Sequence, residues 1–212
     1  SPYALDGGAF DEAYRRPEDR ALSRRSALES LVLLKNNGAL PLIKAPGRVA
    51  VIGWHAGTIR SMFGGYTHMS MAEGACGDVA TMAGVEAEDT ARRGEHPRYP
   101  GTFVTDEAPL RAGYEAIARA FYPQVKTLHE QLRETFPHSD VRYAYGYDYA
   151  GTDERGFAEA LALVRESDLA ILTLGGKHGT GFTCTTGENV EAADIGLPPA
   201  QEKFIRLARD AC

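Results

Sequence analysis

Three short, largely apolar runs stand out along the chain. They are Gly47–Gly53 (GRVAVIG), Asp168–Leu174 (DLAILTL) and the less apolar Val141–Tyr145 (VRYAY). A short apolar run without polar alternation is typical of a strand that is buried on both faces of a sheet. The pattern therefore predicts three strands, with Val141–Tyr145 nearer an edge of the sheet.

Helical periodicity separates these runs. Apolar residues recur at helical spacing over 125–136 and 157–164, and a last helix is predicted from Pro198 onward. A further helix is predicted from Pro17, which suits a first helical turn, to the stop signal Asn36–Gly38. This alternation of strands and helices predicts an α/β fold, a three-layer sandwich around a mainly parallel sheet.

The periodicity disappears over about 67–103, where glycines, methionines and polar residues dominate. A structureless stretch of this length is uncommon in a compact domain, and it favours either a disordered surface insertion or a lid over a site. Because sheets typically have about 5–6 strands and only three are evident, we expect a fold truncated at its C-terminus and a longer natural polypeptide. Strands hidden in the middle stretch are the alternative.

Composition narrows the possible classes of protein. Of the 212 residues, 43% are hydrophobic and 25% charged, as in globular proteins, and no apolar run approaches the ~20 residues of a membrane helix. The net charge of −6 argues against nucleic acid as a partner. Three widely spaced cysteines argue against a disulfide framework and for a reducing, cytoplasmic location, and no His or Cys spacing suits a metal site.

The segments that follow two of the predicted strands are the places where chemistry is expected. Ligands of open parallel sheets bind beyond the carboxyl ends of the strands. Residues 53–67 and 175–189 follow such ends and are rich in glycine and hydroxyl-bearing side chains. Neither segment has the order of a phosphate-binding motif, which weakens a flavodoxin-like nucleotide binder as an interpretation.

Five side chains in these two segments are candidates for ligand binding or catalysis. Trp54 and Tyr66 offer flat apolar faces that suit sugar rings, with core packing beneath the loop as the alternative for Trp54. Lys177 and His178 either steer a polar ligand or are solvated charge. Glu188 is the isolated carboxylate of its loop, so it is a candidate general acid or base, with an ordinary exposed glutamate as the alternative.

Two separated blocks of sequence carry a family resemblance. The first runs from ALESLVLLKN at Ala27 through LPL to RVAVIG, which ends at Gly53, and the second from Asp168 through Thr186-Gly187-Glu188 to Gln201. In order and spacing they resemble the C-terminal domain of glycoside hydrolase family 3, which includes β-glucosidases and β-xylosidases. The resemblance covers about 20–66 and 140–212 and is weak between them.

The resemblance implies a domain organisation. The family's domain is a three-layer α/β sandwich packed on an N-terminal (β/α)8-type barrel. Residues 1–19 would then be a linker from that barrel, and 20–212 a partial sandwich domain with a long loop at about 67–103. No metal or organic cofactor is implied.

The resemblance also implies a mechanism. Family members retain anomeric configuration, with an aspartate nucleophile on the barrel and, in members with a T/S-G-E-G-x-D-R pattern, a glutamate acid/base that aligns with Glu188. This sequence departs from that pattern: Asn189 replaces the glycine, and Glu191-Ala192 replaces the Asp-Arg pair.

The resulting expectation is part of a retaining, exo-acting β-glycosidase that hydrolyses terminal β-linked glucose or xylose. The partners would be a β-linked oligosaccharide or glycoside and the barrel domain of the same polypeptide, with homo-oligomerisation left open. Without the nucleophile, the isolated chain is expected to be inactive. The alternative is a non-catalytic carbohydrate-binding or interaction domain with the same fold. The predicted site consists of catalytic Glu188 and the substrate-binding residues Trp54, Arg60, Tyr66, Lys177 and His178.

Overall fold

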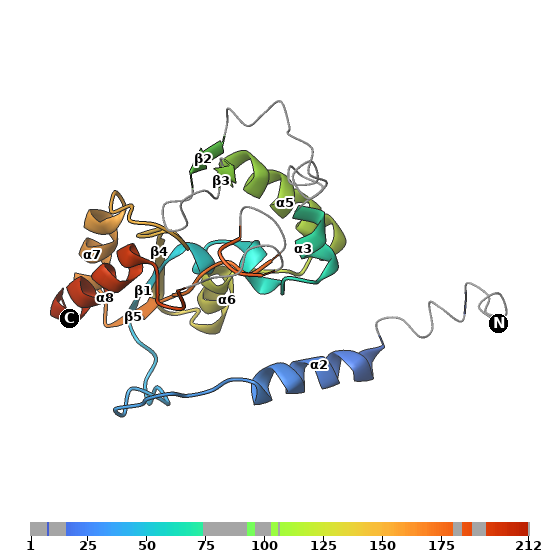
Figure 1. Cartoon of the computed structure of the whole chain (residues 1–212). Helices are drawn as coiled ribbons and strands as arrows, with labels where there is room; N and C mark the ends of the chain where they lie inside the picture. The colour runs from blue at the N-terminus through green and yellow to red at the C-terminus, as the bar shows by residue number, and fades with distance from the viewer. Residues whose placement is uncertain are drawn as a thin grey trace. The chain divides into compact units, whose positions relative to one another are not determined.

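The computed structural model divides the chain into two compact units, residues 1–44 and residues 45–212 (Figure 1). The structure describes residues 8, 16–73, 93–95, 103–105, 107–179, 184–187 and 194–211, with backbone alone between 93 and 112. Glu188 and most of the stretch 67–103 therefore lie outside the described residues. Among the described helices, none has both the length and the apolarity that crossing a bilayer requires.

The sheet of the second unit has three parallel strands in the order β4-β1-β5. Their bounds are Asp140–Ala144, Arg48–Ile52 and Leu169–Leu172. Val49 of β1 lies opposite Val141 and Leu169 of its two neighbours. The three predicted strands and the α/β fold are confirmed, and β4 lies at an edge of this sheet as its weaker apolar pattern suggested.

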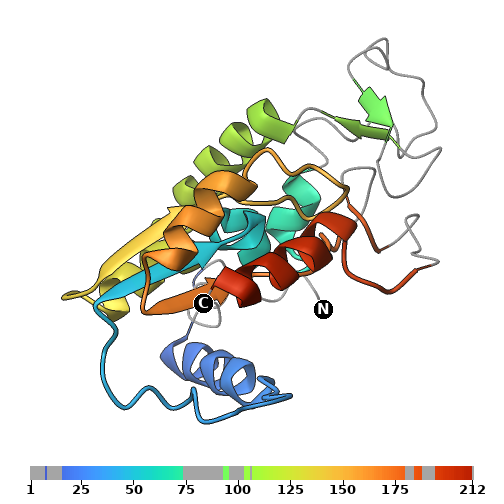
Figure 2. The ribbon, with the colours of Figure 1, turned by 90° about the vertical axis from the view of Figure 1, so that its left-hand side faces the viewer.

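Helices cover both faces of the sheet. On one face, α7 (Phe157–Arg165) and α8 (Pro199–Ala211) lie side by side over the strands, as both views of the ribbon show (Figures 1 and 2). On the other face lies α6 (Leu128–Thr135). The predicted helices within 125–136, over 157–164 and after Pro198 are confirmed.

The central strand β1 is buried because it faces both helix layers. Its side chains alternate, so that Ala50 and Ile52 join the cluster with Phe204, whereas Val49 and Val51 pack on the side of α6. All four are fully buried, which accounts for the uninterrupted apolar run in the sequence.

The remaining elements of the second unit lie between β1 and α6 in sequence. A third apolar cluster joins residues of η2, α3 and α5, namely Ile59, Met69, Tyr114 and Ala118. The short strands β2 and β3 pair antiparallel in a sheet of their own. The bounds are Trp54–Ala56 (η1), Ile59–Met62 (η2), His68–Glu73 (α3), Arg93–Glu95 (β2), Phe103–Thr105 (β3) and Glu107–Phe121 (α5).

None of the four helical elements in this group was predicted, including the α-helices α3 and α5. Helix α3 lies inside the stretch of about 67–103, where no helix was expected. Helix α5 begins shortly after the end of that stretch. The sequence did carry a signal for α5, since Leu110, Tyr114, Ile117 and Phe121 recur at helical spacing.

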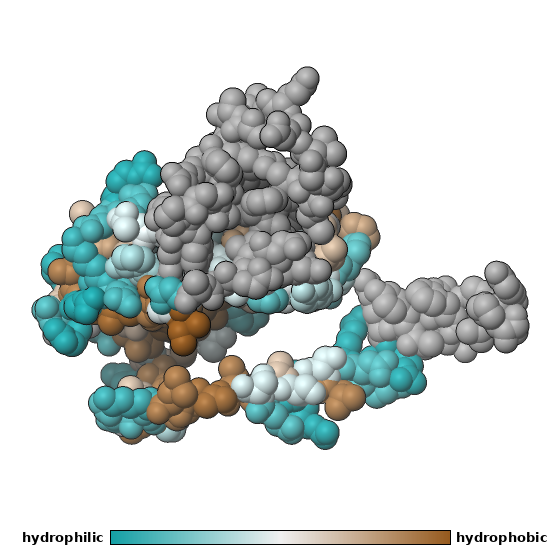
Figure 3. All heavy atoms as spheres, in the orientation of Figure 1, coloured by the Kyte–Doolittle hydropathy of each residue, from teal (hydrophilic) through white to brown (hydrophobic). Residues whose placement is uncertain are grey.

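In the first unit, helix α2 (Pro17–Glu29) begins at the proline that the sequence analysis proposed but is shorter than expected. It ends at Glu29, with Ser30 as the C-cap, several residues before the predicted stop at Asn36–Gly38. None of its residues is buried, and a helix of this length gains little from propensity without tertiary packing. The apolar residues 31–34 that follow are 63–92% exposed, and apolar atoms gather along this unit in the space-filling view (Figure 3).

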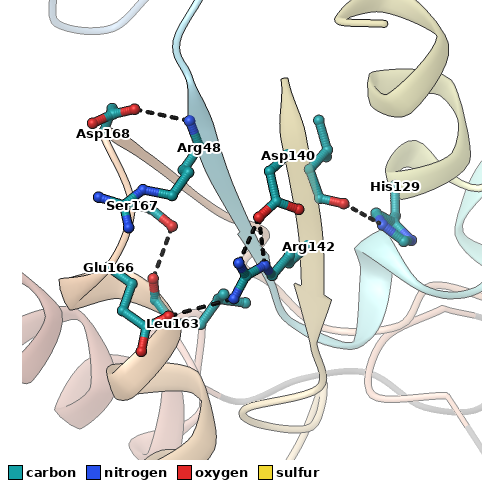
Figure 4. Close-up of polar contacts among 9 residues, drawn as sticks. Arg48, His129, Asp140, Arg142, Leu163, Glu166, Ser167 and Asp168 are labelled. Carbon is teal, nitrogen blue, oxygen red and sulfur yellow. Dashed lines mark hydrogen bonds and ion pairs between the residues drawn. The ribbon is translucent and has the colours of Figure 1, made fainter. Parts of the chain in front are cut away.

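The amino ends of the strands are joined by polar contacts (Figure 4). The carboxylate of Asp168 accepts a 2.8 Å hydrogen bond from the backbone of Arg48, and Arg142 pairs with Asp140 and Glu166. The two ion pairs are exposed, so each contributes little to stability. The glycine-rich segments 53–67 and 175–189 follow the opposite, carboxyl ends of strands β1 and β5.

Candidate functional site

The loops that follow β1 and β5 meet at the carboxyl edge of the sheet. Gly53 leaves β1 with φ 115°, and a Cβ at this position would lie 2.5 Å from Oγ1 of Thr173. The amide of Thr173 in turn donates a 2.9 Å hydrogen bond to the carbonyl of Ile52. Glycine at 53 therefore allows the two strand ends to remain paired while the chain turns into the first loop.

A pocket of about 380 Å³ opens between these two loops. Its walls come from both of them and from nowhere else among the described residues. The lining residues are Trp54, His55, Arg60, Ser61, Met62, Phe63 and Gly64 from the first loop and Gly176, Lys177 and His178 from the second. The structure thus brings together four of the five predicted binding residues.

His55 joins the two loops directly. Its Nε2 lies 2.9 Å from the carbonyl oxygen of Gly176, across a sequence separation of 121 residues. Because a carbonyl only accepts, Nε2 is the donor and carries the proton. Burial lowers the pKa of His55, and the hydrogen bond to Gly176 opposes that shift.

Arg60 makes a second connection between the loops. Its side chain is inside the protein, with the residue only 4% exposed. Nη2 donates a 2.8 Å hydrogen bond to the carbonyl of His178, and Nη1 donates a 3.0 Å bond to the carbonyl of Phe63. These donors of the guanidinium are therefore engaged with the backbone of the two pocket loops.

Lys177 and Trp54 are packed together beneath the pocket. Each is only 3% exposed. Nζ of Lys177 lies 5.8 Å from the ring centroid of Trp54 and 5.4 Å from that of Tyr149, close enough for cation–π attraction. The indole also packs edge-on against His55 and Tyr149. The structure thus gives Trp54 the core packing that was the alternative to a sugar platform, at the wall of the pocket.

Tyr66 lies beyond the lining residues. It is 67% exposed, and its ring lies 6.3 Å from that of His178 in an edge-on arrangement. His178 lies over Gly65, where a Cβ would collide with the imidazole. Tyr66 and His178 therefore form an exposed aromatic pair at the rim.

The second loop folds back on itself. The amide of Lys177 donates to Oγ1 of Thr185 at 2.9 Å, and the amide of Thr185 donates to the carbonyl of Lys177 at 2.8 Å. The amide of Gly179 donates to the carbonyl of Thr186 at 3.1 Å. We call residues 176–179 and 184–187 the arm. The described chain continues to Gly187, and Glu188 is next in sequence.

Sequence reasoning missed His55 and Tyr149 as parts of this site. His55 lies inside the segment 53–67, but nothing local showed that it would contact the other loop. Tyr149 follows the carboxyl end of β4. That position could have marked it as a candidate, because ligands of parallel sheets bind beyond the carboxyl ends of the strands. Among the described residues, no carboxylate lines the pocket and no three His, Cys, Asp or Glu side chains cluster as metal ligands would.

Comparison with known protein families shows that the sequence profile of one family matches most of this chain. The sequence profile of the glycosyl hydrolase family 3 C-terminal domain matches residues 31–212. That range includes all three strands of the sheet and both loops of the pocket.

Individual relatives match over shorter or weaker alignments. A probable β-glucosidase I from Aspergillus fumigatus is 28% identical over 71% of this chain and 22% of its own length. A β-glucosidase from Rhizobium radiobacter is 50% identical over 27% of this chain and 8% of its own length. A probable exo-1,4-β-xylosidase from Aspergillus terreus is 28% identical over 87% of this chain and 16% of its own length. The chain thus spans less than a quarter of each of these relatives.

Proposed function

Since this chain belongs to the family of glycosyl hydrolase family 3 C-terminal domains, we propose that it is part of a retaining, exo-acting β-glycosidase. The complete enzyme removes terminal β-linked glucose or xylose. This chain supplies the acid/base, Glu188, and part of the sugar site. The names of the matched relatives, β-glucosidases and a β-xylosidase, support these two sugars.

The observation that carries the proposal is the pocket between the loops after β1 and β5. It lies where open parallel sheets bind ligands, and both of its walls come from the segments that the family pattern covers. The arm runs from the lining residues Lys177 and His178 to Gly187, directly before Glu188. The proposed acid/base is therefore covalently attached to the loop that forms one wall.

The proposed chemistry needs two carboxyl groups. In a retaining glycosidase they lie about 5–5.5 Å apart on opposite sides of the scissile bond. Glu188 protonates the leaving group and then, as carboxylate, activates the water that releases the sugar. The second carboxyl group is an aspartate on a barrel domain of the same polypeptide.

The proposed sugar site consists of Trp54, Arg60, Tyr66, Lys177 and His178. Tyr66 and His178 offer exposed ring edges and faces at the rim, which suit the apolar face of a pyranose. Lys177 places a buried cation in the wall, and its burial against Trp54 keeps the ammonium in one position. A cytoplasmic location remains an expectation from the cysteine pattern.

The test is the variant Glu188→Ala in the complete enzyme. Loss of the acid/base should reduce kcat/KM for glycosides with poor leaving groups on the order of 10²- to 10⁴-fold, and much less for activated aryl glycosides, because kcat/KM reports the first step. Added azide should partly restore turnover of the activated glycosides, because it fits the space of the carboxylate and attacks the glycosyl-enzyme. Glu159→Ala, an exposed glutamate on α7, is the matched control and should behave as the parent.

An enzyme whose Glu188→Ala variant turns over both classes of glycoside normally would contradict this proposal. The departures at Asn189 and Glu191-Ala192 favour one specific alternative in that case. The chain would then be a non-catalytic carbohydrate-binding or interaction domain with the same fold, and sugar titration without turnover would identify it.

A further inference from the structure

A buried arginine beside a pocket needs a physical explanation. Removing a guanidinium from water is costly unless its N–H groups are hydrogen-bonded. Arg60 meets this condition through the carbonyls of Phe63 and His178, one from each loop of the pocket. Its own amide donates at 3.2 Å to Oγ1 of Thr58, which caps the short helix η2. Arg60 is thus fixed within the first loop by hydrogen bonds and donates a further hydrogen bond to the second loop.

The bond to His178 reaches the arm at its centre. His178 forms an isolated parallel bridge with Thr186, and the next residue, Gly179, donates its amide to the carbonyl of Thr186. Restraining the carbonyl of His178 therefore restrains the pairing of the two halves of the arm. Gly187 follows that pairing by one residue and Glu188 by two.

The guanidinium also packs against the arm. A Cβ on Gly179 would lie 2.6 Å from Nη2 of Arg60 and 2.5 Å from Sγ of Cys184, so Gly179 packs closely against the guanidinium and against the other half of the arm. Gly187 has φ 135°, and a Cβ there would collide with the carbonyl of Gly179. There is thus no room for a side chain at Gly179 beside Arg60, nor at Gly187 beside the other half of the arm.

We infer that Arg60 is a positioning residue for acid/base catalysis: it fixes the arm that carries Glu188. This inference rests on the proposed function and changes the role of Arg60 within it. Sugar binding would require the guanidinium to donate to a ligand, whereas the described bonds go to the backbone. Lysine cannot replace it, because an ammonium lacks the rigid planar fork that reaches two carbonyls at once.

The experiment measures kcat and KM of the complete enzyme with dinitrophenyl and phenyl β-glucosides, which have good and poor leaving groups. The variants are Arg60→Met, Arg60→Lys, Glu188→Ala and the double variant Arg60→Met with Glu188→Ala. Arg60→Met should lower kcat/KM for the phenyl glucoside on the order of 10²-fold, as expected for a misplaced catalytic group, and should change kcat/KM for the dinitrophenyl glucoside little. Arg60→Lys should not restore the loss.

The double variant separates the two possible roles of Arg60. If Arg60 acts through Glu188, adding Arg60→Met to Glu188→Ala should lower kcat/KM for the phenyl glucoside little further, because the two effects are coupled. Arg206→Ala, an exposed arginine on α8, is the matched control. Gly179→Ala perturbs the same arm with Arg60 retained and should reproduce the dependence on leaving group, even where an Arg60 variant fails to fold.

A rise in KM for both glucosides, with unchanged dependence on leaving group and additive losses in the double variant, would overturn the inference and assign Arg60 to sugar binding. Normal behaviour of Glu188→Ala alone would instead overturn the proposed function on which the inference rests. The two failures are therefore distinguishable in one set of measurements.

Discussion

At the scale of single residues, His55 shows how burial and one hydrogen bond determine a charge state. Nε2 donates to the carbonyl of Gly176, and Nδ1 is buried with no hydrogen-bond partner among the described residues. Adding a proton at Nδ1 would bury a charge without an acceptor, so the pKa is lowered, with burial as the largest cause. The neutral imidazole is the form that fits this site.

This arrangement predicts a pH dependence of stability. Below about pH 6.5 the unfolded chain protonates His55 while the folded chain does so only at lower pH, so the unfolded state binds more protons. The free energy of unfolding should therefore fall as pH decreases through that window. His55→Gln should reduce this slope in urea unfolding. Equal slopes for the parent and His55→Gln would contradict the prediction.

At the scale of elements, α6 shows why a short helix starts where it does. Thr127 accepts a 3.1 Å hydrogen bond from the amide of Glu130, and the carboxylate of Glu130 accepts a 2.8 Å bond from the amide of Thr127. This capping box satisfies two amides that the first turn would otherwise leave unpaired. The helix then covers the face of the sheet formed by Val49 and Val51.

Thr127→Ala should lower the free energy of unfolding by about 1 kcal/mol, because it removes the side-chain half of the cap. The control is Thr135→Ala on the same helix, where the exposed hydroxyl bonds to the carbonyl of Gln131. That change should stay within about 0.5 kcal/mol. Denaturant unfolding of the three proteins measures both effects, and an equal loss in the two variants would show that the cap has no special role.

At the scale of the whole molecule, the two edges of the sheet differ. The amino ends are joined by exposed polar contacts (Figure 4), whereas the loops that follow the carboxyl ends form the pocket. The proposed reaction needs two carboxyl groups. The proposal assigns one, Glu188, to this chain and the other to a barrel domain, so that the active site is divided between them.

A divided site predicts that the 212-residue chain alone hydrolyses neither p-nitrophenyl β-glucoside nor p-nitrophenyl β-xyloside. A version extended to include the barrel should hydrolyse at least one of them, and the ratio of rates gives the sugar preference. Substantial turnover by the short chain would show that it contains both carboxyl groups. Inactivity of both forms would favour the binding domain.

The sequence by itself predicted the three strands of the parallel sheet, the helices α6, α7 and α8 of the second unit, and the family. An apolar run such as 48–52 predicts a buried strand, and apolar residues at helical spacing predict a helix. Both predictions need only residues that are close together in the sequence. The order of the motifs along the chain identified the family in the same way. The position of Glu188 relative to the pocket stays a prediction, since that residue lies outside the described part of the chain.

Only the tertiary structure decided the strand order and the partners of the site residues. Nothing near Lys177 in sequence shows that it lies between Trp54 and Tyr149, and nothing near Arg60 shows that its guanidinium reaches the carbonyl of His178. These contacts join residues far apart in the chain. They exist because parallel strands bring their carboxyl ends to one edge, where packing rather than local pattern selects which side chains meet.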